Sequence, residues 1–137
     1  MNQPEPAADS QTPARTEIHP SAVVHPSAQL GSGVIVGPFA VIDAHVIVGD
    51  HCHIGPHAHL TGHTTLGRRN RVHSGAVIGD APQDLKYTDA PTRLRIGDDN
   101  VFRENATVHR SNKLEEDTVV GDGNFFMVNC HIGHNCL

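Results

Sequence analysis

Apolar residues recur at every sixth position along most of the chain. The first uninterrupted run has eleven members: Ile18, Val24, Leu30, Val36, Ile42, Val48, Ile54, Leu60, Leu66, Val72 and Ile78. The same spacing resumes in two further groups: Ile96, Phe102 and Val108, then Val120, Phe126 and Ile132. A helix repeats every ~3.6 residues and a flat strand every two, so neither explains a period of six. The period predicts a parallel β-helix, in which short strands coil round a narrow core and stack on equivalent strands of the next coil.

Two neighbouring positions also have a fixed composition. Gly directly follows the apolar residue at nine positions, which hold nine of the thirteen glycines: 31, 37, 49, 55, 67, 79, 97, 121 and 133. This phase predicts a corner that requires a positive φ angle or a close backbone approach. Two residues before the apolar one the side chain is often small, as at Ala40, Cys52 and Cys130. Because positions two apart on a strand share a face, these small residues, including both cysteines, are expected to be buried.

Two polar segments interrupt the period, and we interpret both as excursions from the coil. They lie at about 79–95 and 109–119. Leu114 stays in phase, so the second segment could also be a poor six-residue unit. We favour excursions, because loops that leave a rigid scaffold are where function concentrates. The β-helix is thus expected over 18–137, preceded by a disordered tail at 1–17 that is rich in Pro, Ala, Gln and acids.

Composition narrows the possible partners and surroundings. The 137 residues have room for one domain, and only five are aromatic, which suits a narrow aliphatic core. A net charge of −5 and scattered Lys and Arg argue against a nucleic-acid partner. No apolar run reaches the ~18 residues of a membrane span. Three cysteines without an export signal indicate free thiols in a reducing compartment, so we expect a cytoplasmic protein.

Several motifs, in order and with comparable spacing, carry a resemblance to one family. They are Ile78-Gly79, Gln83-Asp84-Leu85-Lys86-Tyr87, Pro91-Thr92-Arg93, Ile96-Gly97, Arg103 to Arg110, and His131-Ile132-Gly133-His134-Asn135-Cys136. Over 18–137 the chain closely resembles the acyl-(acyl-carrier-protein)–UDP-N-acetylglucosamine O-acyltransferases, which are hexapeptide-repeat acyltransferases. The resemblance implies an all-β, left-handed parallel β-helix. It also implies that this helix is incomplete at the C-terminus, because further coils and a helical C-terminal domain are expected to follow.

The resemblance also implies an activity and a set of site residues. The expected reaction moves a 3-hydroxyacyl chain from acyl-carrier protein to the 3-hydroxyl of UDP-N-acetylglucosamine, the first step of lipid A biosynthesis, in a homotrimer. His134 matches the general base, and an imidazole with a pKa near ~6.5 suits that role. His109 and His131 match histidines of the same cleft. Three further residues match the loop that binds the nucleotide sugar: Gln83, Asp84 and Lys86.

Asn135 departs from the family pattern, in which an acid often follows the base. An amide can still form a hydrogen bond with the imidazole, but it stabilises an imidazolium ion less well than a carboxylate does. The residues expected to set acyl-chain length lie beyond this sequence, which also does not fix the exact sugar acceptor.

Two other functions remain open at this point. His109, His131 and His134 could hold zinc, as three histidines do in γ-class carbonic anhydrases. The surrounding loops match the acyltransferase instead, so we expect neither a metal nor a cofactor. The chain could also be a non-catalytic β-helix that serves as a remnant or an interaction module. Most of the remaining histidines are expected to be solvated: His19, His25, His45, His51, His53, His57, His59, His63 and His73. Four arginines are likewise interpreted as solubilising charges: Arg93, Arg95, Arg103 and Arg110.

Overall fold

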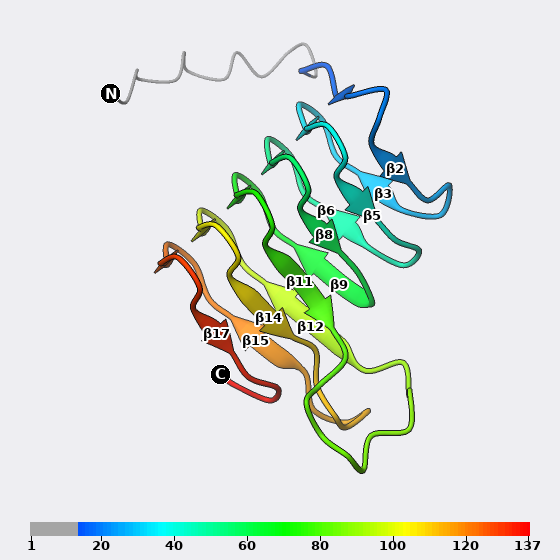
Figure 1. Ribbon diagram of the computed structural model, residues 1–137, viewed down its shortest axis with the longest axis vertical. Helices are drawn as coiled ribbons and strands as arrows, with labels where there is room; N and C mark the ends of the chain where they lie inside the picture. Colours follow the sequence, from blue (N-terminus) through cyan, green and yellow to red (C-terminus); the bar gives the residue numbers. More distant parts are fainter. Residues whose placement is uncertain (1–13) are drawn as a thin grey trace.

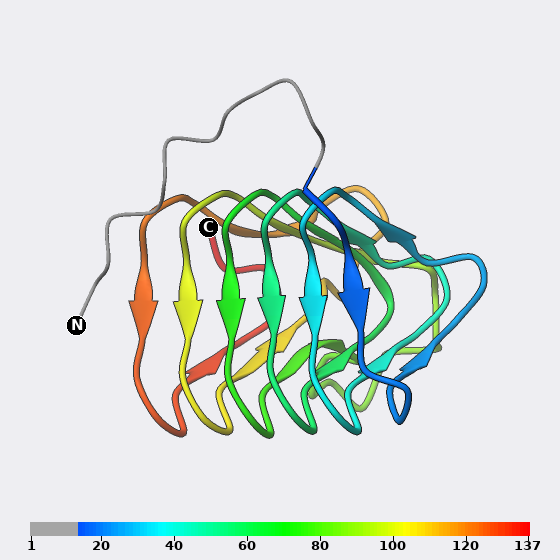
Figure 2. The same ribbon diagram turned by 90° about the horizontal axis from the view of Figure 1, so that it is seen from above.

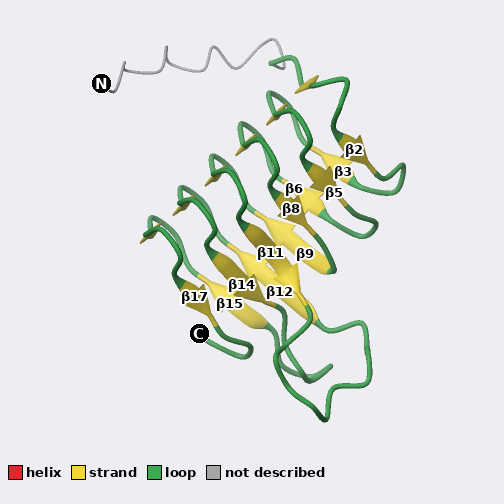
Figure 3. Cartoon of the chain, in the orientation of Figure 1, coloured by secondary structure: helices red, strands yellow, loops and turns green. Residues whose placement is uncertain are grey.

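The computed structural model describes residues 14–137 and shows a coil built only of short strands (Figures 1 and 3). Residues 1–13 of the expected tail lie outside the described residues, and Glu17 already belongs to the first strand. The described part contains no helix, and therefore none that could cross a bilayer.

The strands form three parallel sheets, one on each side of the coil. The first sheet contains β1 (Glu17–Ile18), β4 (Ile35–Val36), β7 (His53–Ile54), β10 (Arg71–Val72), β13 (Val101–Phe102) and β16 (Phe125–Phe126). The second contains β2 (Val23–Val24), β5 (Val41–Ile42), β8 (His59–Leu60), β11 (Val77–Asp80), β14 (Thr107–His109) and β17 (His131–Ile132). The third contains β3 (Gln29–Leu30), β6 (Ile47–Val48), β9 (His63–Leu66), β12 (Arg93–Ile96) and β15 (Thr118–Val120). Figure 2 shows the six strands of the first sheet side by side.

The period of six corresponds to the inward position of every strand. In the first sheet Val36 pairs with Ile54 and Ile54 with Val72, and these side chains are at most 2% exposed. The small residues two positions earlier, such as Ala40 and Cys52, are equally buried. Each coil therefore adds a large apolar side chain on each face to a continuous core. The position two residues earlier is also filled, by an apolar side chain or, as at Thr64 and Asn70, by a buried polar one. The predicted left-handed parallel β-helix is confirmed.

Of the two expected reasons for the repeated glycines, close backbone approach holds for most of them and positive φ for one. Among the nine, only Gly79 has a positive φ, at 95°. Most of the others lie against the next coil, so that a Cβ on Gly49, for example, would be 2.5 Å from the carbonyl oxygen of Gly67. Positive φ instead recurs three residues after the inward residue: Gly33, Phe39, His45, His51, His57, Arg69, Gly75, Asp99, Asn105, Gly123, Asn129 and Asn135. Asn, Asp and His adopt this conformation more readily than most side chains, which accounts for three of the many histidines.

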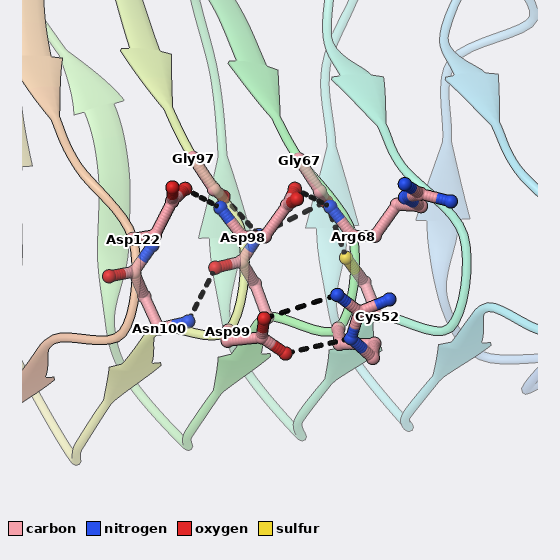
Figure 4. Close-up of polar contacts among 10 residues, drawn as sticks. Cys52, Gly67, Arg68, Gly97, Asp98, Asp99, Asn100 and Asp122 are labelled. Carbon is pink, nitrogen blue, oxygen red and sulfur yellow. Dashed lines mark hydrogen bonds and ion pairs between the residues drawn. The ribbon is translucent and has the colours of Figure 1, made fainter.

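A polar ladder crosses the corner between the third and first sheets. Asn70 Nδ2 donates to the carbonyl oxygens of Gly67 and Gly97 at 3.0 and 2.8 Å, and Asn70 Oδ1 accepts from the backbone N–H of Asn100 at 2.9 Å. Cys52 occupies the preceding rung and donates to Gly67 at 3.1 Å. Figure 4 shows Cys52 beside Gly67, with Asn100 two coils further along the same corner. The ladder satisfies backbone groups that stacked strands leave unpaired where the chain turns.

A second row of side chains runs beside the ladder, on the outside of the same corner. Asp98 accepts from the backbone N–H of Arg68, and Asp122 from that of Asp98, at 2.7 and 2.6 Å (Figure 4). Each carboxylate thus bridges to the corner of the preceding coil.

Both long loops leave the coil at the corner between the second and third sheets. The first joins β11 to β12 and the second joins β14 to β15, so they emerge on successive coils (Figure 1). Leu114, the residue that stayed in phase, is 55% exposed and therefore does not belong to the core. The third-sheet register is unaffected, because β9, β12 and β15 pair in sequence across both loops.

Candidate active site

Three histidines gather at the corner between the second and third sheets, on the last two coils: His109, His131 and His134. His131 directly precedes the inward Ile132 and therefore points outward, and its strand places it over Thr107. His131 Nδ1 lies 2.8 Å from Thr107 Oγ1, so the threonine hydroxyl fixes the orientation of the ring. The rings of His109 and His131 meet edge to face, with 4.6 Å between their centroids. Strand pairing thus brings together histidines that are 22 positions apart in the sequence.

His109 is the most enclosed of the three. Its side chain follows the inward Val108, the residue is 9% exposed, and its Nδ1 has no hydrogen-bond partner among the described residues. Burial lowers the pKa of His109, and the positive charge that His131 can carry lowers it further. His109 is therefore neutral near pH 7 and can act as a hydrogen-bonding group without adding charge.

His134 is oriented by the next residue. Asn135 takes the positive-φ position of its corner, at 60°, and its Oδ1 lies 2.8 Å from His134 Nδ1. The contacts of the Asn135 amide allow only one orientation. Its Nδ2 donates to Ser111 Oγ and to Glu116 Oε2, both at 3.1 Å. Its Oδ1 accepts from the backbone N–H of Asn112, also at 3.1 Å. Oδ1 must accept, so we assign the proton of neutral His134 to Nδ1. The lone pair of Nε2 is then available to take a proton.

Asp84 brings a carboxylate to the same corner from the first loop. Its Oδ2 accepts from Asn112 Nδ2 at 2.8 Å and its Oδ1 from the backbone N–H of Lys86 at 3.0 Å. The hydrogen bond from Asn112 is the main cause that lowers the pKa of Asp84, followed by that from Lys86, with smaller contributions from the charges of His134 and Lys86. Asp84 is therefore ionised at neutral pH and close enough to His134 to interact electrostatically with it.

The structure does not bring every expected site residue into contact. Gln83 and Lys86 are exposed, and within residues 14–137 neither side chain forms a hydrogen bond to the histidines. His109, His131, His134 and Asp84 do share the corner. Gln83 and the Lys86 ammonium lie on the loop that presents Asp84.

Arg110 and Asn112 are structural parts of the site that the sequence did not reveal. The side chain of Arg110 is 12% exposed, so its interpretation as a solubilising charge was wrong. Its guanidinium group donates to Tyr87 Oη at 3.1 and 3.2 Å and to the carbonyl oxygen of Gly79 at 3.0 Å, and it reaches Asp89 at 3.4 Å. The second loop thereby braces the first. Neither residue occupies a repeated position, so no periodic signal marks it.

The zinc alternative gains no support from this geometry. Among residues 14–137 no three His, Cys, Asp or Glu side chains are arranged to hold a metal ion. His131 Nδ1 faces Thr107 and His134 Nδ1 faces Asn135, so a metal could use only the Nε2 atoms of these two rings.

Comparison with known proteins first concerns the repeat. The family described as bacterial transferase hexapeptide (six repeats) matches residues 45–80. This segment therefore resembles hexapeptide-repeat transferases, in agreement with the stacked six-residue units of the parallel β-helix.

The more particular resemblance is to one group of acyltransferases, as the motifs indicated. Acyl-(acyl-carrier-protein)–UDP-N-acetylglucosamine O-acyltransferases from Akkermansia muciniphila and Aeromonas salmonicida are 47% and 51% identical over 73 residues, which are 53% of this chain and 28% of each relative. The UDP-N-acetylglucosamine O-acyltransferase structure from Moraxella catarrhalis superposes with a TM-score of 0.82 at 37% identity, over 85% of this chain and 46% of that one. The corresponding structure from Acinetobacter baumannii gives 0.85 at 36% identity, over 88% and 47%. The resemblance to this family is confirmed, and the chain matches about half the length of its solved structures.

Proposed function

We propose that this chain carries the catalytic corner of an O-acyltransferase that moves a 3-hydroxyacyl group from acyl-carrier protein to UDP-N-acetylglucosamine, as in lipid A biosynthesis. The observation that carries the proposal is the bond between His134 and Asn135, which leaves Nε2 unprotonated beside an ionised Asp84. A base with a free lone pair and a neighbouring carboxylate suit the deprotonation and binding of a sugar alcohol. The relatives act on the same kind of substrate by name.

In the proposed reaction His134 Nε2 takes the proton of the sugar 3-hydroxyl as the oxygen attacks the thioester carbonyl carbon. The C–O bond forms, the C–S bond breaks, and the proton passes from His134 to the departing thiolate of the carrier. Asp84 accepts hydrogen bonds from the sugar, while Lys86 offers a positive charge to the diphosphate. Gln83 lies on the same loop, and His109 and His131 line the cleft.

A homotrimer fits this arrangement, because the corner is presented on the outer surface and a neighbouring subunit could close it. Its substrates would then lie between subunits. The free thiols of Cys52, Cys130 and Cys136 agree with a cytoplasmic location.

The proposal can be tested by replacing the base. A 3-hydroxyacyl-carrier thioester and UDP-N-acetylglucosamine are supplied to the wild type, to His134→Ala and to His25→Ala, whose exposed histidine lies near the other end of the coil. We expect His134→Ala to lose at least ~100-fold in kcat while the oligomer, measured by light scattering, is unchanged. His25→Ala should match the wild type.

Activity of His134→Ala within a few-fold of wild type would exclude the assigned base. Loss of wild-type activity on treatment with a chelator would favour the zinc alternative. A wild type that neither turns over nor binds the UDP-sugar would favour the non-catalytic β-helix.

A further inference from the structure

Asn112 connects the two chemically distinct parts of the candidate site. Its side-chain Nδ2 donates to Asp84 Oδ2 at 2.8 Å, while its backbone N–H donates in another direction to Asn135 Oδ1 at 3.1 Å. Asn135 Oδ1 in turn accepts from His134 Nδ1 at 2.8 Å. A continuous chain of three hydrogen bonds therefore runs from the carboxylate of the first loop to the imidazole of the last corner.

The backbone around Asn112 is fixed by the first loop and by the coil. Immediately before it, the N–H of Arg110 donates to the carbonyl oxygen of Asp80 at 3.0 Å, and that of Ser111 donates to Arg93 at 3.3 Å. These two acceptors stand at the start and the end of the first loop. Ser111 is fully buried, and its hydroxyl accepts from Asn135 Nδ2 at 3.1 Å. The position of Asn112 is thus set by groups other than its own side chain.

The amide of Asn112 also has a single workable orientation. Its Oδ1 is buried and has no hydrogen-bond partner within the described residues. Rotating the amide by half a turn would bring this oxygen against the Asp84 carboxylate and place two acceptors face to face. A buried acceptor without a partner costs free energy. The orientation of the Asn112 amide is therefore set by the hydrogen bond from its Nδ2 to Asp84, which outweighs the cost of the unpaired Oδ1.

We propose that Asn112 is a positioning residue that holds Asp84 and the Asn135–His134 pair in one fixed arrangement. The inference rests on the proposed function: Asp84 binds the sugar, His134 removes its proton, and Asn112 sets the two groups relative to each other. Its side chain serves Asp84 alone and its backbone serves Asn135, so the two connections can be cut separately.

The kinetic test uses that separation. Asn112→Ala removes the donor to Asp84 but keeps the backbone N–H, so we expect KM for UDP-N-acetylglucosamine to rise about tenfold with kcat within about twofold of wild type. Asn135→Ala removes the acceptor of His134, so we expect kcat to fall about tenfold or more with KM within about twofold. Lys113→Ala is the matched control, since its exposed side chain only approaches Glu116 at 4.0 Å.

Asn112→Asp distinguishes donation from packing, because Asp has nearly the same shape as Asn but places a second carboxylate opposite Asp84. A donor role predicts that KM for Asn112→Asp exceeds that for Asn112→Ala. A packing role predicts that Asn112→Asp resembles the wild type, and that result would overturn the proposal. Circular dichroism of each variant shows that the coil is intact.

A third measurement is independent of acyl transfer. In carboxyl-labelled protein, the ¹³C signal of Asp84 should titrate at higher pH in Asn112→Ala and Asn112→Asp than in wild type, although Lys86 and His134 still face it. The ¹⁵N signals of His134 should show the Nδ1 proton retained in Asn112→Ala. If these shifts occur while no variant, nor the wild type, turns over substrate, the proposed function fails and the positioning role stands. If turnover occurs but Asp84 titrates unchanged in both variants, the positioning role fails alone.

Discussion

Replacing Asn70 by Ala should show how much the coil depends on its polar ladder. Asn70 is completely buried and forms three hydrogen bonds: two from Nδ2 to Gly67 and Gly97, and one from the N–H of Asn100 to Oδ1. Asn100 is equally buried, so water cannot replace the acceptor that its N–H loses. An unsatisfied buried donor costs about 1–3 kcal/mol, and the lost bonds to partly buried carbonyls add to this. We therefore expect the free energy of unfolding to fall by about 2–4 kcal/mol, a large share of the ~5–15 kcal/mol that stabilises a typical protein.

Urea unfolding followed by circular dichroism, at matched protein concentration, measures this loss. The control is Asn124→Ala, one rung beyond Asn100, where the residue is exposed and water can replace the lost side chain. The substitution removes the hydrogen bonds from Asn124 Nδ2 to Asn100 Oδ1 at 3.0 Å and to the carbonyl oxygen of Asp122 at 3.3 Å, while Asn100 Oδ1 still accepts from the backbone N–H of Asn124 at 2.9 Å. We expect the control to lose no more than about 1 kcal/mol. A loss below ~0.5 kcal/mol for Asn70→Ala, or an equal loss for both variants, would refute the argument that the ladder supports the corner by satisfying buried backbone groups.

Three further sets of variants test the same structural reasoning. Gly97→Ala would place a Cβ 2.0 Å from Asp122 Oδ1, so the free energy of unfolding in urea should fall by about 1–3 kcal/mol. The Cβ of Gly121→Ala meets no atom within 4 Å, so this variant should stay within ~0.5 kcal/mol of wild type; equal effects would show that close approach does not select these glycines. Gly123→Ala also meets no atom but has a φ of 69°, so it should lose about 1 kcal/mol from backbone strain alone, and an unchanged midpoint would contradict this. Burial lowers the pKa of His109, so the unfolded chain binds more protons than the folded one once the pH falls below ~6.5, and the free energy of unfolding should decrease from about pH 7 to pH 5. His109→Gln should make this decrease less steep, and an identical pH dependence in both proteins would count against the prediction.

The core of the fold could be predicted from the sequence because the six-residue spacing of apolar residues determines which side chains point inward. The inward position of Ile54 depends on its place in its own six residues, and its partners Val36 and Val72 follow at intervals of eighteen. The backbone conformation of the corners could not be assigned in the same way. A glycine at a fixed position in the repeat can serve either a positive φ or a close backbone approach. Only the stacked coils show that Gly49 is needed because a Cβ would clash with Gly67, while His51 has the positive φ.

The candidate site was predictable only as far as its residues lie in recognisable motifs. His109 and His131 meet edge to face, and His134 lies close enough to both His109 and Asp84 to interact electrostatically with them, while the roles of these residues stay predictions. Asn112 contacts Asp84 across 28 positions, through two loops that have no repeat to set their course. Contacts of this kind depend on how each loop folds back, so the sequence pattern contains no trace of them.

The placement of both loops on one edge has a consequence for engineering. Ile78 and Val108 pair before the loops begin, and Leu94 and Thr118 pair after they end, so the register on either side does not depend on what lies between. The interval from 81 to 92 can therefore be altered without shifting the strands beneath it. A transplanted loop would still have to supply the groups that Asn112 and Arg110 contact at Asp84 and Tyr87, because these contacts join the two loops.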